Sequence, residues 1–217
     1  MPEILTETEA RVVGALIEKQ LTTPEYYPLT LNALIAACNQ KTNRDPVVSF
    51  TEQTVQKSLD DLREKNIAYV FYGSTSRVPK YKHILDKYCE LEPSETAVIC
   101  VLLLRGAQTL GELRERTGRL YEFSGLGEVS ETLDGLMRKE EPLVVKLERQ
   151  PGQKEVRYAH LLSGEVSVTA SQTPEKSFSV KQTENERVAK LEEDLENLRS
   201  EFDLFRQSFE DFKKQFE

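Results

Sequence analysis

The sequence is poor in the side chains that build catalytic and metal sites. Its 217 residues include two histidines and three cysteines, Cys38, Cys89 and Cys100, which lack a C-x-x-C spacing. An odd number of thiols in or beside apolar helical segments favours reduced, structural cysteines. No Cys, Ser or carboxylate cluster supplies the second half of a catalytic pair for a histidine. The sequence therefore predicts a non-enzymatic protein with no metal and no cofactor.

Long apolar runs are also missing. The longest, Ala97 to Leu104, has eight residues, whereas a bilayer-spanning helix needs roughly 20. The N-terminus has no basic segment followed by an apolar one, as a secretion signal would. We expect a cytoplasmic protein that does not enter a membrane.

The chain also has fewer basic than acidic residues. The chain has 29 Lys and Arg against 37 Asp and Glu, a net charge of −8, and residues 165–217 alone have eight basic and thirteen acidic side chains. An acidic chain lacks the broad positive field typical of nucleic-acid-binding proteins, although a local basic patch can persist.

An internal repeat is the most informative feature present. Six residues recur after an interval of 86 positions: Leu5, Glu9, Val12, Val13, Leu16 and Ile17 return as Leu91, Glu95, Val98, Ile99, Leu102 and Leu103. Further on, residues 80–85 (KYKHIL) match residues 157–162 (RYAHLL). One supersecondary unit is used twice in tandem, and we call residues 1–85 the first repeat and residues 86–164 the second repeat.

Each repeat has the pattern of three helices. Thr6-x-x-Glu9 is a capping box ahead of apolar residues at helical spacing, and Thr30 and Thr109 precede the second helices. Ser49-x-x-Glu52 is expected to open the third helix of the first repeat, and residues 128–139 have the equivalent stripe.

Two β-rich runs follow the third helix of each repeat, over residues 67–72 and 78–84, and over 143–147 and 156–161. Turn residues separate the two runs. Three helices and a hairpin make a winged helix-turn-helix. The expected fold is α+β, mainly α, with winged-helix domains at residues 1–85 and 86–164.

The sequence also resembles the YceH-like family of bacterial proteins. The resemblance is carried by residues 26–34 (YYPLTLNAL), 37–47 (ACNQKTNRDPV) and 149–164 (RQPGQKEVRYAHLLSG), and it extends over residues 3–164. It implies a tandem winged-helix fold and does not imply an activity.

A winged helix typically binds DNA through its third helix and its hairpin, or wing. The candidate residues lie before or on the third helix of the first repeat and on both hairpins: Lys41, Asn43, Arg44, Gln53, Gln56, Lys57, Arg77, Lys80, Lys82, Arg149, Lys154 and Arg157. Cationic and amide side chains there can reach phosphates.

The hairpin cations and the candidates in residues 39–44 each have a structural alternative. The hairpin cations can be solvated charges, and residues 39–44 can be a loop whose side chains tie the second helix to the third. In the second repeat, Glu128, Glu131 and Asp134 on the third helix would repel phosphates. His83 and His160 occupy equivalent positions of the repeat, which indicates packing.

The C-terminal region differs from both repeats. Residues 165–183 are rich in Ser and Thr and predict a flexible linker, and residues 184–217 predict a coiled-coil helix. Its apolar seam is formed by Val188, Leu191, Leu195, Leu198, Phe202, Phe205, Phe209, Phe212 and Phe216. Charges flanking the seam favour a parallel homodimer, and the alternative is an amphipathic helix that packs on another surface.

Two functions remain open. The first is a DNA-binding regulator, dimerised by the C-terminal helix. The second is an acidic winged-helix adaptor that binds a protein partner without contacting DNA.

Overall fold

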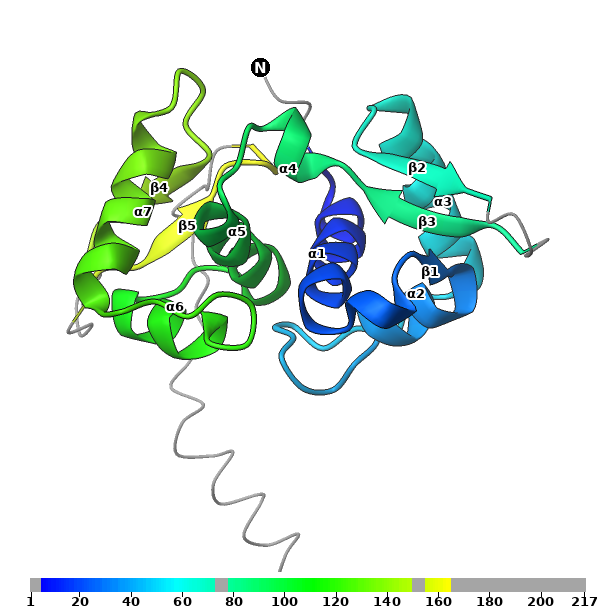
Figure 1. The fold of residues 1–217 in the computed structure, drawn as a ribbon, viewed down its shortest axis with the longest axis horizontal. Coiled ribbons are helices and arrows are strands. Elements are labelled where there is room, and N and C mark those ends of the chain that lie inside the picture. The colour runs from blue at the N-terminus through cyan, green and yellow to red at the C-terminus, as the bar shows by residue number, and fades with distance from the viewer. Residues whose placement is uncertain (1–4, 73–77, 150–154, 165–217) are drawn as a thin grey trace, which may run out of the picture. The chain divides into compact units, whose positions relative to one another are not determined.

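The first repeat forms helices that pack against a three-stranded antiparallel sheet (Figure 1). This computed structural model describes residues 5–72, 78–149 and 155–164. The elements of the first repeat are α1 (Glu7–Thr22), the 3₁₀ turn η1 (Pro24–Tyr26), β1 (Leu29–Thr30), α2 (Leu31–Cys38), α3 (Glu52–Glu64), β2 (Ala68–Phe71) and β3 (Lys80–His83). The strand order is β1-β3-β2, so the strand before α2 pairs with the hairpin after α3.

The second repeat also has three helices followed by a hairpin, but a short helix precedes them and the sheet has two strands. Its elements are α4 (Leu85–Tyr88), α5 (Pro93–Arg105), α6 (Leu110–Thr117), α7 (Leu126–Arg138), β4 (Val144–Lys146) and β5 (Tyr158–His160). Leu29 pairs with Tyr81 in the first repeat, and a single bridge between Gln108 and Tyr158 takes the equivalent place in the second. The expected α+β, mainly helical class is confirmed, and the arrangement is consistent with a winged helix.

The helix starts follow from side-chain caps. The Thr6 backbone N–H donates to Glu9 at 2.6 Å and the Glu9 N–H donates to the Thr6 hydroxyl at 3.2 Å, which confirms the predicted capping box. Thr30 and Thr109 cap α2 and α6 as expected. Each cap satisfies amides that have no partner inside the helix.

The predicted start of α3 was wrong by two residues. Thr51, not Ser49, is the N-cap, and its hydroxyl accepts from the Thr54 N–H at 3.2 Å. Asn39 explains the shift, because its amide group both donates to the Phe50 carbonyl at 2.9 Å and accepts from the Phe50 N–H at 2.7 Å. These bonds hold residue 50 outside the helix, so α3 begins after it.

Equivalent positions of the two repeats make equivalent contacts. The buried Glu9 carboxylate lies 2.8 Å from the Lys65 ammonium, and Glu95 lies 3.2 Å from Lys139. The Ile67 N–H donates to the Leu62 carbonyl at 2.9 Å, as the Leu143 N–H does to the Leu136 carbonyl at 3.1 Å. The repeat seen in the sequence is therefore also a repeat of tertiary contacts.

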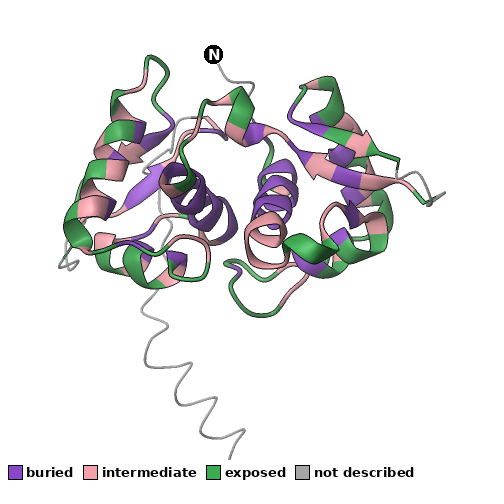
Figure 2. Ribbon diagram, viewed as in Figure 1, coloured by how far each residue is buried: buried purple, intermediate pink, exposed green. Residues whose placement is uncertain are grey.

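The repeats pack together through α1 and α5, which are buried over most of their length (Figure 2). A Cβ added at Gly14 would lie 2.9 Å from the Leu104 side chain, so the absence of a side chain permits this approach. A backbone hydrogen bond of 2.7 Å also joins the start of the first repeat to the end of the second, from the Leu5 N–H to the Leu162 carbonyl. One apolar core consequently contains residues of both repeats.

Two groups of predicted residues lie outside the described part of the chain. They are the coiled-coil positions from Val188 to Phe216 with the preceding linker, and the hairpin residues Arg77 and Lys154. Within residues 5–72, 78–149 and 155–164, no helix has the length and apolar character needed to cross a membrane.

Candidate nucleic-acid interface

The exposed side of α3 has amides and a lysine in its first half and carboxylates in its second. Gln53 is exposed near the helix start. Gln56 donates to both carboxylate oxygens of Asp60 at 3.1 and 3.2 Å, and the Lys57 ammonium lies 2.6 Å from Asp61. In the first half of α3, which would enter a DNA groove before the second half, Glu52 is the only carboxylate. Lys57 of this half is already paired with Asp61.

The hairpin of the first repeat has two chemically different faces. Tyr81 and His83 point into the core, so Lys80 and Lys82 lie on the other face of the strand. Tyr69 is directly opposite Lys82 in the sheet register, and the Lys82 ammonium lies 6.0 Å from the centre of the Tyr69 ring.

Phe71 is directly opposite Lys80 on the same outer face of the hairpin. Tyr69 is 37% exposed, Phe71 is 42% exposed and Tyr72, at the end of the strand, is 70% exposed. We call the outer residues Tyr69, Phe71, Lys80 and Lys82 the wing face.

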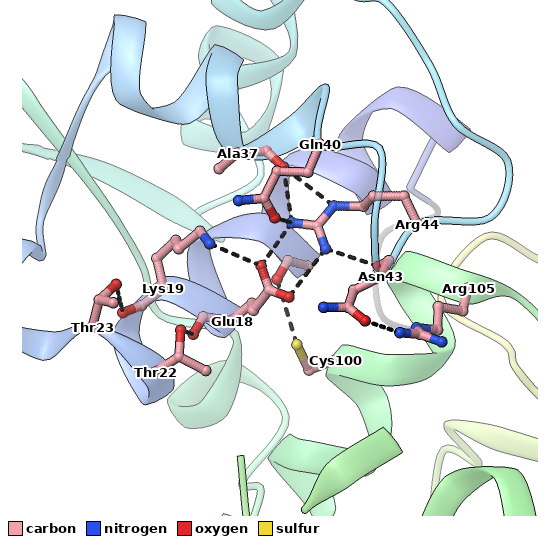
Figure 3. Close-up of polar contacts among 11 residues, drawn as sticks. Glu18, Lys19, Thr22, Thr23, Ala37, Gln40, Asn43, Arg44, Cys100 and Arg105 are labelled. Carbon is pink, nitrogen blue, oxygen red and sulfur yellow. Dashed lines mark hydrogen bonds and ion pairs between the residues drawn. The ribbon is translucent and has the colours of Figure 1, made fainter. Parts of the chain in front are cut away.

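Arg44 was wrongly included among the candidate DNA-contacting residues. Its side chain is fully buried and lies 2.7 Å from the Glu18 carboxylate (Figure 3). The guanidinium also donates to the Ala37 carbonyl at 2.8 and 3.2 Å, to Gln40 and to the Asn43 carbonyl. A buried cation with these acceptors cannot reach a phosphate, and the structural alternative, a loop tied by its own side chains, describes Arg44.

Arg44 and its neighbours also perturb Glu18. Burial raises the pKa of the Glu18 carboxyl, but the hydrogen bonds and positive charge of Arg44, with the charge of Lys19, outweigh burial, and the pKa is lowered overall. Glu18 is therefore ionised at neutral pH, and the Arg44–Glu18 pair joins α1 to the loop before α3 as two opposite charges.

Lys41 and Asn43 are exposed on that loop. Asn43 has a positive φ of 60°, and its side-chain oxygen accepts a hydrogen bond from Arg105 of the second repeat. Lys41 therefore keeps the exposure that a phosphate contact needs, whereas Asn43 already joins the two repeats.

The hairpin of the second repeat is a weaker candidate. Arg149 is exposed, but Arg157 donates to the Ala107 carbonyl and to the Glu112 carboxylate, both at 2.8 Å. Glu131 is exposed on α7, and Asp134 lies 4.0 Å from Arg138 on the same helix. These carboxylates make α7 a poorer candidate than α3 for a contact with phosphate.

The histidines and cysteines in the described part of the chain have pKa values that are shifted by burial in the core. Burial is the largest cause lowering the pKa of both His83 and His160 to about 4. The three thiols are free, and burial raises the pKa of Cys38 to about 12 and that of Cys89 to about 11. An imidazole with a lowered pKa is a weak base, and a thiol with a raised pKa is protonated at neutral pH, so both kinds of side chain suit the core.

Sequence reasoning missed the wing aromatics and a group of arginines between the repeats. Tyr69 and Phe71 were assigned only to a strand, although alternation with buried Ala68 could have placed them outside. Arg105 donates to Asn43, 62 positions away, and Arg116 donates to Gln108, eight positions away. No local pattern reports such a meeting.

These features describe a mainly helical α+β protein with a winged-helix order of elements. The family described as "Protein of unknown function, DUF480" matches residues 5–153. Among relatives, a UPF0502 protein of Pelobacter propionicus is 50% identical over 223 residues, with all of both chains covered. The UPF0502 protein YceH of Escherichia fergusonii is 49% identical over 209 residues, covering 89% of this chain and 95% of the relative. The chain belongs to the UPF0502, or YceH-like, family, which confirms the resemblance found in its sequence.

Proposed function

We propose that this protein is a non-enzymatic, tandem winged-helix protein that binds double-stranded DNA through its first repeat. In this proposal residues 1–85 and 86–164 are the two winged-helix domains. The equivalent contacts of Glu9 and Glu95, and the equivalent strand pairings of Leu29 and Gln108, support the tandem assignment.

The wing face carries the proposal. Lys80 and Lys82 stand on the outer side of the hairpin, and within the described part of the chain neither forms an ion pair. Lysines held by a rigid sheet can contact phosphates at low cost in side-chain desolvation. Gln53 and Lys57 of α3 provide amide and ammonium donors for a groove.

The two repeats have different roles in this proposal. After Glu52, the first half of α3 has Gln53, Gln56 and Lys57, whereas the corresponding half of α7 has Glu128 and Glu131. Phosphate repels carboxylates, so only the first repeat would face the duplex closely. The second repeat would support the first through the packing of α1 on α5.

The test is fluorescence anisotropy with a mixed-sequence DNA duplex at roughly 50 and 200 mM salt. We expect binding that weakens steeply with salt, and a loss of binding in the Lys80→Glu/Lys82→Glu variant. A control variant, Lys87→Glu/Arg138→Glu, makes the same change in charge at exposed residues away from the wing face. Absence of binding at the lower salt concentration, or equal weakening by both variants, would contradict the proposal.

A protein-binding adaptor is the second candidate, and the exposed aromatic side chains of the wing favour it. Tyr69, Phe71 and Tyr72 would bury apolar area against a partner. The net charge of −8 also suits a protein partner better than DNA. If duplex DNA does not bind, a loss of partner capture on changing Phe71 to Ser, with capture kept in a Tyr88→Ser control, would support the adaptor.

We further propose that the C-terminal residues 184–217 dimerise the protein as a parallel coiled coil. The proposal rests on the apolar heptad pattern of the sequence. Light scattering of the full chain should give a dimer mass, and Leu198→Asp/Phe205→Asp at the seam should give a monomer. Ser200→Asp/Gln207→Asp, outside the seam, should remain dimeric. A seam variant with the wild-type mass would refute the coiled-coil dimer.

A further inference from the structure

A cavity of about 520 Å³ lies where the two repeats meet. The first repeat contributes the C-terminal half of α1 and the loop after α2, and the second contributes the end of α5 and the helix α6. Figure 3 shows part of this lining, with Glu18, Asn43 and Arg105 on different segments. Its volume is in the range of sites that bind small molecules.

Positive charge gathers around this cavity although the chain as a whole is acidic. Lys19, Arg105, Arg116 and Arg119 line it, against the carboxylates of Glu18 and Glu115. The Glu18 carboxylate is already occupied, because it lies 2.7 Å from buried Arg44 and 3.4 Å from Lys19. The remaining cations therefore exceed the carboxylates available to neutralise them.

The arginines of the cavity also lie close enough to repel one another. Burial lowers the pKa of Arg105, and the positive charges of Arg116 and Arg44 lower it further. An anion between these side chains would relieve that repulsion. Arg105 donates to Asn43, and Arg116 donates to Gln108 and lies 3.4 Å from Glu112. Because a guanidinium has five N–H donors, each arginine has further donors for such an anion.

Among the cations that line the cavity, Arg119 has the fewest internal partners. It is exposed at the rim of the cavity, just after α6, and it forms no hydrogen bond or ion pair within the described ranges. A guanidinium presents five N–H donors in a planar fork that matches carboxylate and phosphate oxygens. Arg116 and Arg119 thus offer two guanidinium groups to a ligand with two anionic groups, and Lys19 of α1 lines the same cavity.

We infer that this cavity binds a small molecule with two or more phosphate or carboxylate groups. The lining comes from both repeats, so the ligand would bridge them. It would also contact the loop of Gln40, Thr42 and Asn43, which leads toward α3. A bound polyanion would therefore stabilise the position of α3 relative to the second repeat. The site does not depend on DNA binding, because its residues are distinct from the wing face.

Isothermal titration calorimetry of the full chain with pyrophosphate and with citrate tests the inference, with sodium chloride at matched ionic strength as the blank. We expect saturable binding of at least one of the two probes, and the stronger probe identifies phosphate or carboxylate chemistry. The Arg116→Gln/Arg119→Gln variant should bind about tenfold more weakly or worse. Arg114→Gln/Arg138→Gln, on the exposed sides of α6 and α7, should bind as the wild type does.

Three results separate the possible explanations. Arg119→Gln alone should weaken binding without affecting folding, because this side chain is exposed. Lys80→Glu/Lys82→Glu should keep the wild-type affinity for the probe, which distinguishes the cavity from the proposed DNA surface. Lack of saturable binding by either probe at millimolar concentration, or equal weakening by the Arg114/Arg138 control, would overturn the inference.

Discussion

The thiol of Cys100 donates a hydrogen bond of 3.5 Å to the backbone carbonyl of Gly14. These two residues occupy the same position of the repeat, since 86 residues separate them, as they separate Leu5 from Leu91. The two equivalent helices α1 and α5 therefore meet at equivalent points, as two subunits do around a two-fold axis. Close packing at this point depends on Gly14.

Substituting Gly14 tests that packing. A Cβ there would approach Leu104 to 2.9 Å and the Leu103 Cβ to 3.1 Å, whereas a Cβ at Gly111 has only Thr109 nearby, at 4.0 Å. We expect Gly14→Val to lower the free energy of unfolding by about 1 to 3 kcal/mol through overpacking. Gly111→Ala should be neutral or stabilising by up to about 1 kcal/mol, because Ala favours helix. Urea unfolding curves measure both, and equal stability of Gly14→Val and wild type would refute close packing.

Glu9 and Glu95 should have matching effects on stability. Each accepts from the backbone at the start of its helix and lies beside the equivalent lysine, Lys65 or Lys139. Replacing either by Gln removes the charge from the cap and from the ion pair, and we expect a loss of about 1 to 3 kcal/mol.

Glu7→Gln provides the control for this pair, because Glu7 is exposed in the same first turn as Glu9. Chemical denaturation should show little change for Glu7→Gln. A large loss for Glu9→Gln with no loss for Glu95→Gln would mean that the two repeats use this position differently.

The buried pair of Glu18 and Arg44 should make the free energy of unfolding depend on pH in the acid range. Arg44→Met leaves the Glu18 carboxylate without its partner, and we expect a loss of about 3 to 5 kcal/mol at neutral pH. The pKa of Glu18 is lowered from 4.5 in the folded state. Its contribution is therefore present above pH 4.5 and is lost as the pH falls through the lower, folded value.

Denaturation curves at several pH values check this dependence. Glu18→Gln should reduce the loss of stability below pH 4.5, and Glu115→Gln, an exposed carboxyl on α6, should not. An unchanged acid profile in Glu18→Gln would contradict the assignment.

His83 and His160 should remain neutral until strongly acid pH. Both have a pKa of about 4 in the folded protein, against 6.5 for an exposed imidazole. Between pH 6.5 and 4 the unfolded chain binds protons that the folded chain does not, so stability falls as the pH falls through this window.

NMR titration of the imidazole resonances measures the two pKa values directly. Both should lie near 4. A midpoint near 6.5 for either histidine would mean that its ring is not buried as the structure describes.

Local sequence patterns were sufficient to predict three helices in each repeat, three of the helix caps and both hairpins. Thr6, Thr30 and Thr109 act within one helical turn, so their roles can be read from neighbouring residues. The two-residue strand β1 was missed, because its pairing with β3 joins residues far apart in sequence. Ser49 was predicted as the cap of α3 instead of Thr51, since the contact of Asn39 with Phe50 crosses eleven positions and leaves no local pattern.

The candidate site was harder to predict for the same reason. The role of Arg44 depends on Glu18, which is 26 positions away, and no short motif joins them. Lys80 and Lys82 were proposed from the sequence as cations of a hairpin, and the structure adds that they alternate with the buried Tyr81 and His83. The cavity between the repeats combines four segments, and only their packing brings Arg105 near Arg116.

The near-symmetric meeting of α1 and α5 has an evolutionary consequence. In a homodimer, every substitution appears in both subunits, so a change that suits one binding surface is imposed on the other. Joining two copies in one chain removes that constraint while keeping the interface, and it makes the association independent of concentration. The two copies are then free to differ, and in this chain Lys57 of α3 stands at the repeat position that Glu131 occupies on α7.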